Sequence, residues 1–228
     1  MSKMTATNGS KLVSGPVRRI GIQSRSITGT MPNGNRYESA LERDFMLLLQ
    51  FNAAVDIYTP QPVTISYQDR NSARHRYTPD GLVEWRQDLP VDDPRPILVE
   101  IKYRKAFEGA WREWRSRFRA ARDFAVERGW TFDVYTEREI RTPFLDNVRF
   151  LLPYMHRNSA PETEECVLTE LARRAESEPR ELIHALGRDK WAQATLLPLL
   201  WKLLAERKIG CDFGRPLTMQ SPIWSLRS

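Results

Sequence analysis

The sequence predicts an α/β domain that is followed by a smaller helical domain. Up to about residue 155, strand-like and helix-like patterns alternate, which is typical of a sheet with helices packed against it. Beyond that point the pattern changes to three helical segments in succession, and an extended segment with several glycines and prolines follows them. We therefore expect an N-terminal arm over residues 1–25, an α/β domain over 26–157 and a helical domain over 158–228.

The composition excludes several classes of protein. No apolar run approaches the roughly 18 residues that a membrane-spanning helix needs, and the N-terminus lacks the apolar core of a secretory signal. We therefore expect a cytoplasmic protein without a membrane partner. With 35 Lys and Arg against 29 Asp and Glu, the net charge of +6 favours a polyanionic partner such as nucleic acid.

The first predicted elements are a hairpin and a helix. Residues before 26 show no sustained periodicity, which indicates a mobile arm. In "SITGTMPNGNRYES", the Asn33–Gly34 pair is typical of a tight turn between two short strands. In "ESALERDFMLLLQF", Leu41, Phe45 and Leu48 recur at helical spacing.

Strands are predicted on both sides of the longest helical segment. The prolines at 60 and 62 interrupt the pattern, and "VTISY", "RHRYTPDGLVEW" and "ILVEIKY" then follow as three strands. The acidic, proline-rich "RQDLPVDDPRP" between the last two is predicted to be a surface loop. A fourth strand, "WTFDVYTE", follows the long helix, with Gly129 as the helix stop.

The clearest helix is predicted over about 107–128, and it carries two stripes. One is apolar, recurs every three or four residues and is expected to face the core: Phe107, Trp111, Trp114, Phe118, Ala121 and Ala125. The other is basic and has the same rhythm: Arg112, Arg115, Arg119 and Arg122. These arginines could contact DNA phosphates, or they could form a solvated face that pairs with nearby glutamates.

The C-terminal segment contains three helical patterns, "ECVLTELARRA", "PRELIHALG" and "KWAQATLLPLLWKLLAERK". Three helices followed by a β-hairpin is the order of elements in a winged-helix module. Many small helical domains share this pattern, so it predicts the elements more firmly than the fold.

Three charged residues within the strand-like segments point to chemistry: Asp80, Glu100 and Lys102. Glu100 and Lys102 are two positions apart, so they share one face of a strand. About twenty residues separate Asp80 from Glu100, enough for one strand to turn and return alongside. Carboxylates in such a site bind a hard cation such as Mg²⁺, with Mn²⁺ as a substitute. The cation would polarise a phosphodiester and activate water, and the lysine would orient that water or stabilise developing charge.

Each of these residues also has a structural interpretation. Asp80 between Pro79 and Gly81 could be a turn residue, and Glu100 and Lys102 could lie on the exposed face of an edge strand. Taken together with the apolar runs around them, they favour the metal site. Glu42 stays open at this point, because the Ser39-x-x-Glu42 spacing fits a helix capping box and also places an acid beside the apolar stripe.

Asp80, followed about twenty residues later by Glu100–Ile101–Lys102, matches the short motif of the PD-(D/E)xK nuclease superfamily. The segments "ESALERDFMLLLQF", "YTPQPVTISY", "RYTPDGLVEW" and "ILVEIKYRKAF" resemble TnsA, the endonuclease subunit of the heteromeric transposase of Tn-seven-like transposons, including CRISPR-associated ones. This resemblance covers about residues 30–140 and extends more loosely to the C-terminal region. It implies a restriction-endonuclease-like domain with a mixed central sheet flanked by helices, followed by a winged-helix-like domain.

The resemblance also implies a function. Members of that family hydrolyse phosphodiester bonds at the 5′ ends of the transposon, on the non-transferred strand, for cut-and-paste transposition. The implied partners are the transposon-end DNA, the DDE transposase TnsB, which processes the 3′ ends, and the AAA+ regulator TnsC. The alternatives are a stand-alone restriction or repair nuclease of the same fold, and a catalytically inactive DNA-binding or assembly adaptor.

The family pattern maps onto four side chains of this sequence. Its helix glutamate corresponds to Glu42, its metal-binding aspartate to Asp80, its acidic or amide position to Glu100 and its catalytic lysine to Lys102. Superfamily analogy adds the backbone carbonyl of Ile101 as a metal ligand, and Glu42 would reach the metal directly or through water.

Three neighbouring positions complete the expectations from the sequence. Gly81 departs from the family pattern, which more often has an aromatic residue there, and we expect it to loosen the packing behind the site. Arg104 and Lys105 follow the active lysine closely, so they are expected to contact DNA more directly than the helix arginines.

Overall fold

The computed structural model describes residues 28–226 except Asn33 and Arg70. The predicted arm over 1–25 therefore lies outside the described residues. The described residues form two compact units, of which unit 1 holds those from 28 to 45 together with 52–137, and unit 2 holds 46–51 together with 138–226.

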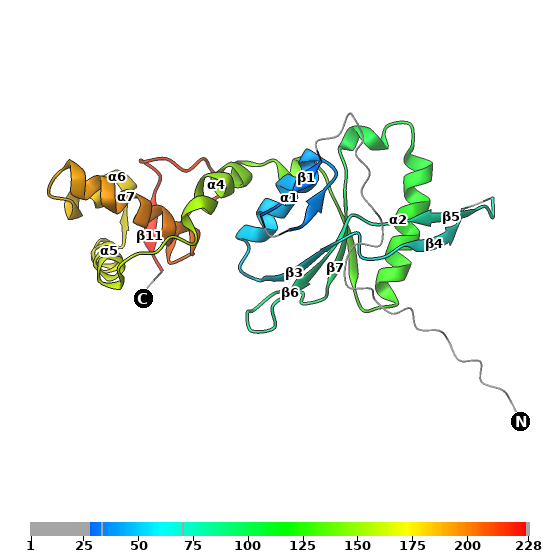
Figure 1. The fold of residues 1–228 in the computed structure, drawn as a ribbon, viewed down its shortest axis with the longest axis horizontal. Helices are drawn as coiled ribbons and strands as arrows, with labels where there is room; N and C mark the ends of the chain where they lie inside the picture. The colour runs from blue at the N-terminus through cyan, green and yellow to red at the C-terminus, as the bar shows by residue number, and fades with distance from the viewer. Residues whose placement is uncertain (1–27, 33, 70, 227–228) are drawn as a thin grey trace, which may run out of the picture. The chain divides into compact units, whose positions relative to one another are not determined.

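The centre of unit 1 is a four-stranded sheet, and three of its strands, β3, β6 and β7, are labelled in Figure 1. Its strands lie in the order β3 (Val55–Pro60), β6 (Gly81–Trp85), β7 (Ile97–Ile101) and β8 (Thr131–Tyr135). β3, β6 and β7 pair antiparallel, whereas β7 and β8 pair in parallel. The mixed central sheet that the resemblance implied is thus confirmed.

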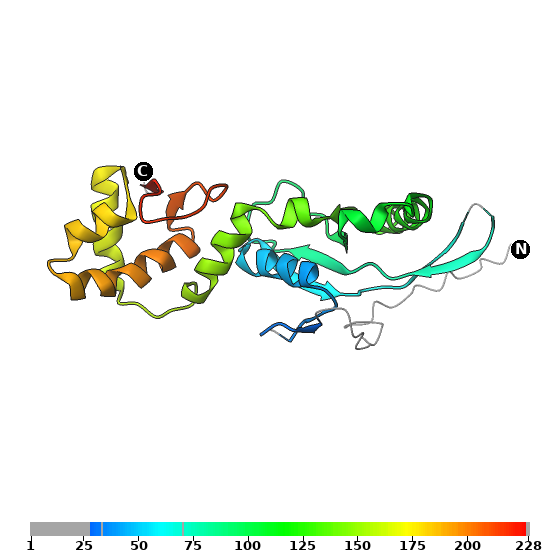
Figure 2. The same cartoon turned by 90° about the horizontal axis from the view of Figure 1, so that it is seen from above.

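Helices cover both faces of this sheet (Figure 2). On one face lies α2 (Trp111–Val126), whose Phe118 and Ala121 join a core with Leu98 and Phe132 of the sheet. On the other face lies the first part of α1 (Ala40–Phe51), whose Phe45 ring packs against Tyr135 at a centroid distance of 4.9 Å. The alternation of strand side chains sends one set of apolar residues to each helix.

The strand segment "RHRYTPDGLVEW" differs from its prediction, because the structure divides it into two strands of different sheets. β5 (Arg74–Tyr77) pairs with β4 (Ile65–Gln68) in a separate two-stranded ribbon, and β6 begins at Gly81. Pro79 lies in the break, where a proline lacks the N–H that a continuous ladder would need. β3 was not predicted at all, since Pro60 was interpreted as an interruption; a proline is tolerated at the end of an edge strand such as β3.

Two further local predictions have different outcomes. The predicted hairpin is confirmed as β1 (Gly29–Thr30) paired with β2 (Arg36–Tyr37), and Gly34 has the positive φ of 88° that a tight turn requires. The helix predicted over about 107–128 is confirmed as α2, but it begins only at Trp111, and a separate short 3₁₀ turn, η1 (Arg104–Phe107), precedes it. Gly109 separates them with φ of 73°, and Trp111 is 56% exposed, so its predicted core position is wrong.

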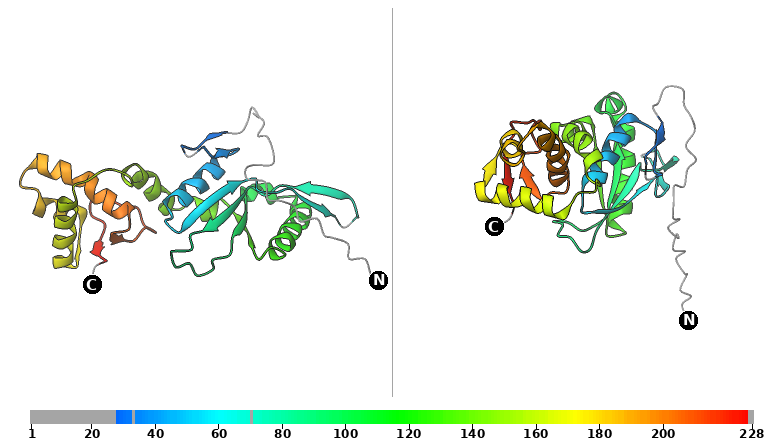
Figure 3. Two further views of the ribbon diagram at one scale, coloured as in Figure 1. Left: turned by 60° about the horizontal axis from the view of Figure 1, so that its bottom comes forward. Right: turned by 60° about the vertical axis from the view of Figure 1, so that its left-hand side comes forward.

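Unit 2 is built from helices and a small three-stranded sheet, and Figure 3 shows it from two sides. After α3 (Glu137–Ile140), the elements are α4 (Pro143–Leu151), η2 (Leu152–Tyr154), α5 (Pro161–Arg174), β9 (Glu176–Ser177), α6 (Pro179–Leu186), α7 (Lys190–Ala205), β10 (Ile209–Cys211) and β11 (Ile223–Ser225). The strands lie in the order β10-β11-β9. The three predicted helices and the strand pair after them are present, β9 was not predicted, and the winged-helix fold stays a prediction.

The division between the units falls earlier in the chain than the predicted boundary at 157. Val148 and Leu151 of α4 are fully buried in one core with Leu171 and Leu200, which belong to the C-terminal helices. Residues 138–157 therefore fold with unit 2. No helix in the described part of the chain is long and apolar enough to cross a membrane.

Candidate active site

Asp80 lies in the break between β5 and β6, with its side chain 15% exposed. Its carboxylate Oδ2 accepts a hydrogen bond of 2.7 Å from the backbone N–H of Ile101. Because the β6–β7 ladder ends at the pair Gly81↔Val99, this amide has no strand partner on that side. The carboxylate of Asp80 takes the place of the missing strand and is thereby fixed at the end of β7.

Glu100 and Lys102 meet Asp80 at this end of the sheet. The Lys102 ammonium lies 3.1 Å from Oε1 of Glu100 and 3.5 Å from Oδ2 of Asp80. Glu100 is nearly inaccessible, at 2% exposed, and its Oε2 accepts a hydrogen bond of 2.7 Å from the hydroxyl of Tyr77. The structure thus brings together the three charges that the sequence motif singled out.

Glu42 forms the helix cap that its spacing indicated. Its carboxylate oxygens accept hydrogen bonds from the Ser39 hydroxyl at 3.0 Å and from the Glu38 backbone N–H at 2.8 Å. Ser39 Oγ in turn accepts a hydrogen bond from the Glu42 backbone N–H at 3.1 Å. The negative charge of Asp80 also raises the pKa of Glu42. It is a capping residue beside the site, and its role as a metal ligand stays a prediction.

Burial and mutual repulsion shift the ionisation of these carboxylates. Burial, and then the charge of Asp80, raise the pKa of Glu42 to about 7 and that of Glu100 to about 7. Burial also raises the pKa of Asp80, although the Lys102 ammonium opposes the shift. Burial alone would lower the pKa of Lys102, but Asp80 and Glu100 outweigh it and raise that pKa above its usual value. One ammonium group therefore faces three acidic groups.

The donor set of the site fits a hard divalent cation in its chemistry. Among the described residues, no three Asp, Glu, His or Cys side chains form a ready-made ligand cluster, and the Lys102 ammonium lies between two of the acids. The acids nevertheless carry more negative charge than one ammonium balances. Gln61 lies next to Asp80, since its backbone N–H donates to the Asp80 carbonyl at 2.9 Å, and its buried amide oxygen has no hydrogen-bond partner among the described residues. Carboxylate and amide oxygens are the ligands that Mg²⁺ accepts.

Sequence reasoning missed three residues that support this site: Tyr77, Gln61 and Glu38. Tyr77 holds Glu100, and Glu38 accepts a hydrogen bond of 3.0 Å from the Gln61 side-chain amide. Gln61 has a positive φ of 48°, an uncommon conformation for a residue with a side chain. Its position between Pro60 and Pro62 was the only signal in the sequence that this backbone is unusual.

The expectation that Gly81 loosens the packing is wrong. A Cβ atom at this position would overlap the ring of Tyr58 on the neighbouring strand β3. The aromatic ring that packs behind the site is thus supplied by Tyr58, and Gly81 leaves the room for it.

The basic residues expected to contact DNA are all exposed. Arg104 and Lys105 lie on η1, directly after the site, and Arg112, Arg115 and Arg119 lie along α2. Glu113 pairs with Arg117 on the same helix and Glu127 with Arg128, so these two glutamates bind arginines outside the predicted basic stripe. A contact between these basic residues and DNA stays a prediction.

Replacing Tyr77 by phenylalanine should weaken the site without unfolding it. The buried ring remains, but Glu100 loses the hydroxyl that orients its carboxylate. Loss of such an outer contact typically costs 10–100-fold in metal affinity or activity. We expect a drop of about that size in the affinity for Mg²⁺, measured by calorimetric titration, and a melting temperature lower by only a few degrees, because the buried Glu100 carboxylate loses one hydrogen bond. An unchanged affinity for Mg²⁺ would show that Tyr77 only fills space.

Family models match two consecutive parts of the chain. The model described as TnsA-like endonuclease N terminal matches residues 52–137, and the model described as TnsA endonuclease C terminal matches 139–213. The first match includes Asp80, Glu100 and Lys102 but not Glu42. No individually curated protein is similar enough to this chain to count as a match. The junction of the two models coincides with the division between unit 1 and unit 2.

Proposed function

The chain belongs to the TnsA endonuclease family, and from this membership we propose that it is the DNA-cutting subunit of a heteromeric transposase. In this proposal it hydrolyses phosphodiester bonds at the 5′ ends of a Tn-seven-like transposon, on the non-transferred strand. The DDE transposase TnsB processes the 3′ ends, and the AAA+ regulator TnsC controls both. The proposal places the protein in the bacterial cytoplasm, where this DNA lies.

The observation that carries the proposal is the convergence of Asp80, Glu100 and Lys102 within the part that matches the N-terminal endonuclease model. Asp80 and Glu100 would hold Mg²⁺, with the backbone carbonyl of Ile101 as a further ligand and Glu42 reached directly or through water. When bound, the ion polarises the scissile phosphate and lowers the pKa of a bound water. Mn²⁺ has the same preference for oxygen ligands and would substitute.

The protein's own groups have distinct parts in this reaction. The raised pKa of Lys102 keeps its ammonium protonated, so it donates hydrogen bonds and does not act as a base at neutral pH. It would orient the attacking water or stabilise the negative charge that grows on the phosphate oxygens. The Ile101 N–H and the Tyr77 hydroxyl hold Asp80 and Glu100 in place for this step.

Unit 2 has a separate part in the proposal. Its element order α5–β9–α6–α7–β10–β11 and its antiparallel strand order support a winged-helix-like module. We assign to it the contact with the regulator or with DNA, because the catalytic side chains all lie in unit 1.

Dependence on partners separates the proposal from its alternatives. A duplex that carries a transposon end and its flanking donor DNA would be labelled on each strand and incubated with Mg²⁺. We expect cutting at the 5′ end only when the partner transposase and regulator are present. Efficient cutting by the chain alone would instead indicate a restriction or repair nuclease. No cutting in any mixture would indicate an inactive adaptor.

A further inference from the structure

The β4–β5 ribbon extends away from the four-stranded sheet (Figure 2). One of its faces is polar and exposed. The cross-strand pairs Ser66↔Arg76 and Gln68↔Arg74 place these four side chains on the same side of the ribbon. We call them the ribbon face. On the opposite side, Ile65 and Tyr77 are buried, so the ribbon is held by its other surface and leaves the ribbon face open.

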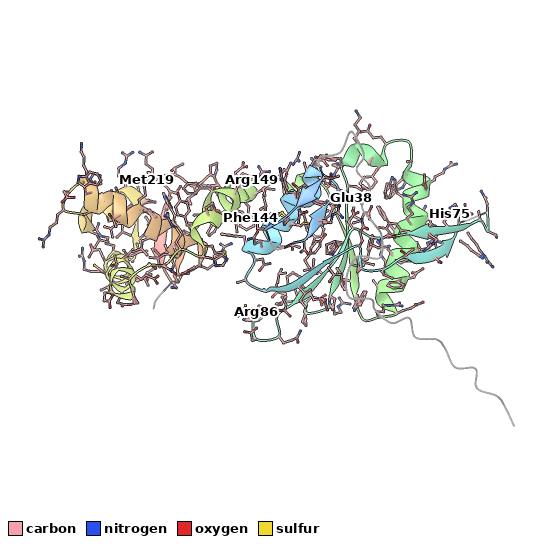
Figure 4. All side chains as sticks on the ribbon, viewed as in Figure 1. Glu38, His75, Arg86, Phe144, Arg149 and Met219 are labelled. Atoms are coloured by element: carbon pink, nitrogen blue, oxygen red, sulfur yellow. The ribbon has the colours of Figure 1, made fainter. Side chains whose placement is uncertain are left out.

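The ribbon is held in a defined shape by its own turn. The Asp69 carboxylate accepts hydrogen bonds from the backbone N–H groups of Asn71 and Ala73 at 2.8 and 3.0 Å. His75, labelled in Figure 4, lies with its Nε2 2.9 Å from Oδ2 of Asp69 and stacks on Tyr67 at a centroid distance of 5.4 Å. A ligand of the ribbon face would therefore meet a surface that needs little further ordering.

The charges on the ribbon face are available to a partner. Within the described ranges, no carboxylate pairs with Arg74 or Arg76, and both side chains are exposed. Arg86 and Arg95 in the same unit contrast with them, since each lies 2.6 Å from an aspartate, Asp88 and Asp93 respectively. Two unpaired guanidinium groups with Ser66 and Gln68 beside them form a donor-rich surface that complements phosphate oxygens.

The ribbon is connected directly to the candidate active site. Tyr77 ends β5 and binds Glu100, and the hydroxyls of Thr64 and Thr78 lie 2.9 Å apart at the base of the ribbon. Arg76 and Arg74 precede Asp80 by four and six positions, which corresponds to roughly 13 and 20 Å of extended chain. In a DNA strand with about 3.4 Å per nucleotide, this is a reach of about four to six nucleotides.

We propose that the ribbon face binds the phosphate backbone of the DNA duplex a few nucleotides from the scissile bond. This inference rests on the proposed endonuclease function and adds the element that aligns the substrate. Arg74 and Arg76 neutralise phosphates, while Ser66 and Gln68 donate hydrogen bonds beside them. A two-stranded ribbon also has the width that the major groove of DNA admits. Because phosphates are the same in every sequence, the contribution is independent of the base sequence.

The test is the salt dependence of duplex binding by the full chain with Arg74→Ala and Arg76→Ala combined. Binding of a fluorescent duplex of mixed sequence would be followed by anisotropy in EDTA, from 50 to 200 mM salt. Each lost phosphate contact removes about 0.9 from the slope of log K against log salt. We expect the slope to fall by about 1.8 and the affinity at low salt to fall by about tenfold or more. The same loss should appear with a second, unrelated sequence.

Arg86→Ala with Arg95→Ala is the matched control, because it removes the same net charge from the same unit. Its arginines are already paired with aspartates, so its slope should remain that of the unaltered chain. The proposal is overturned if the ribbon variant keeps the salt slope and affinity of the unaltered chain, or if both double variants lose the same amount of slope and affinity. It is also overturned if the unaltered chain does not bind the duplex. Unchanged melting temperatures would show that both variants fold.

Cleavage distinguishes this inference from the function on which it rests. If the unaltered chain cuts DNA with Mg²⁺ while the ribbon variant keeps the full salt slope, only the ribbon inference fails. If the ribbon variant loses slope but the unaltered chain never cuts under any partner condition, the endonuclease proposal fails and the binding surface remains.

Discussion

Replacing Lys102 by alanine is expected to slow DNA cleavage by about 10²–10³-fold while the site still binds divalent metal. The ammonium contacts Asp80 and Glu100 but is not itself a metal ligand. Its loss removes the group that stabilises charge on the phosphate and leaves the carboxylates free for the ion. Lys102→Arg should not restore the rate, because the planar guanidinium cannot replace a compact ammonium between two carboxylates.

The measurement is a single-turnover rate on a labelled duplex, together with a calorimetric titration of Mn²⁺. Lys190→Ala is the matched control, since Lys190 is exposed at the start of α7 in unit 2. If Lys102→Ala cut DNA as fast as Lys190→Ala, the catalytic role of Lys102 would be wrong. If the variant lost metal binding as well, the lysine would be needed to form the site and its part in the chemical step would be unproven.

Asp80→Asn should stabilise the metal-free protein and abolish cleavage at the same time. The carboxylate of Asp80 is buried among other acids, and its charge helps to raise the pKa of Glu42 and Glu100. An asparagine can still accept the hydrogen bond from Ile101 N–H but carries no charge. One pKa unit corresponds to about 1.4 kcal/mol, so we expect a gain of about 1 kcal/mol or more at pH 8. For a protein of this size, that gain is about 2–4 °C in the melting temperature of unit 1.

The pH dependence of the stability of the metal-free protein gives the direction of this stabilisation independently. The folded-state pKa of about 7 for Glu42 and for Glu100 lies above the unfolded value of 4.5. The folded state therefore holds more protons between these values, and the stability of the metal-free protein falls as the pH rises from 4.5 past 7. Asp80→Asn should flatten this fall, since it removes one cause of both shifts.

Thermal unfolding from pH 5.5 to 8.5, with and without Mg²⁺, measures both effects. Mg²⁺ should raise the melting temperature of the unaltered chain, because a ligand of the folded state stabilises it, and it should leave Asp80→Asn unchanged. Asp123→Asn, at an exposed position of α2, is the control for a general charge effect. If Asp80→Asn were less stable than Asp123→Asn at pH 8, the mutual repulsion of the acidic groups at the site would be contradicted.

The residues that converge on the site could be predicted because their spacing encodes it. Glu100 and Lys102 share a face by the period of two, and the length between Asp80 and Glu100 fits two antiparallel neighbours, as β6 and β7 are. Glu42 could not be resolved from its spacing alone. The structure shows why: the Glu42 carboxylate caps α1, and the nearby charge of Asp80 also raises its pKa.

What the sequence did not reveal depends on tertiary contacts. Tyr77 and Gln61 join the site through contacts that form only in the folded chain, and apart from the two prolines beside Gln61 no local pattern marks them. The division at Pro79 was missed because the polarity pattern on both sides was interpreted as one strand. The division between the units differs from the predicted boundary at 157 because the apolar residues of α4 pack in the core of unit 2. The sequence pattern alone does not show which core an apolar helix face joins.

Strand-resolved cleavage of a transposon-end duplex tests the central claim most directly, namely that Asp80, Glu100 and Lys102 form a metal-dependent DNA-cutting site. The unaltered chain and Asp80→Asn would be compared in the presence of the partner proteins, with Mg²⁺ and with EDTA. We predict a cut on the 5′-ended, non-transferred strand by the unaltered chain with Mg²⁺, and no such cut with EDTA or with Asp80→Asn. An equal cut by Asp80→Asn, or an equal cut in EDTA, would contradict the account.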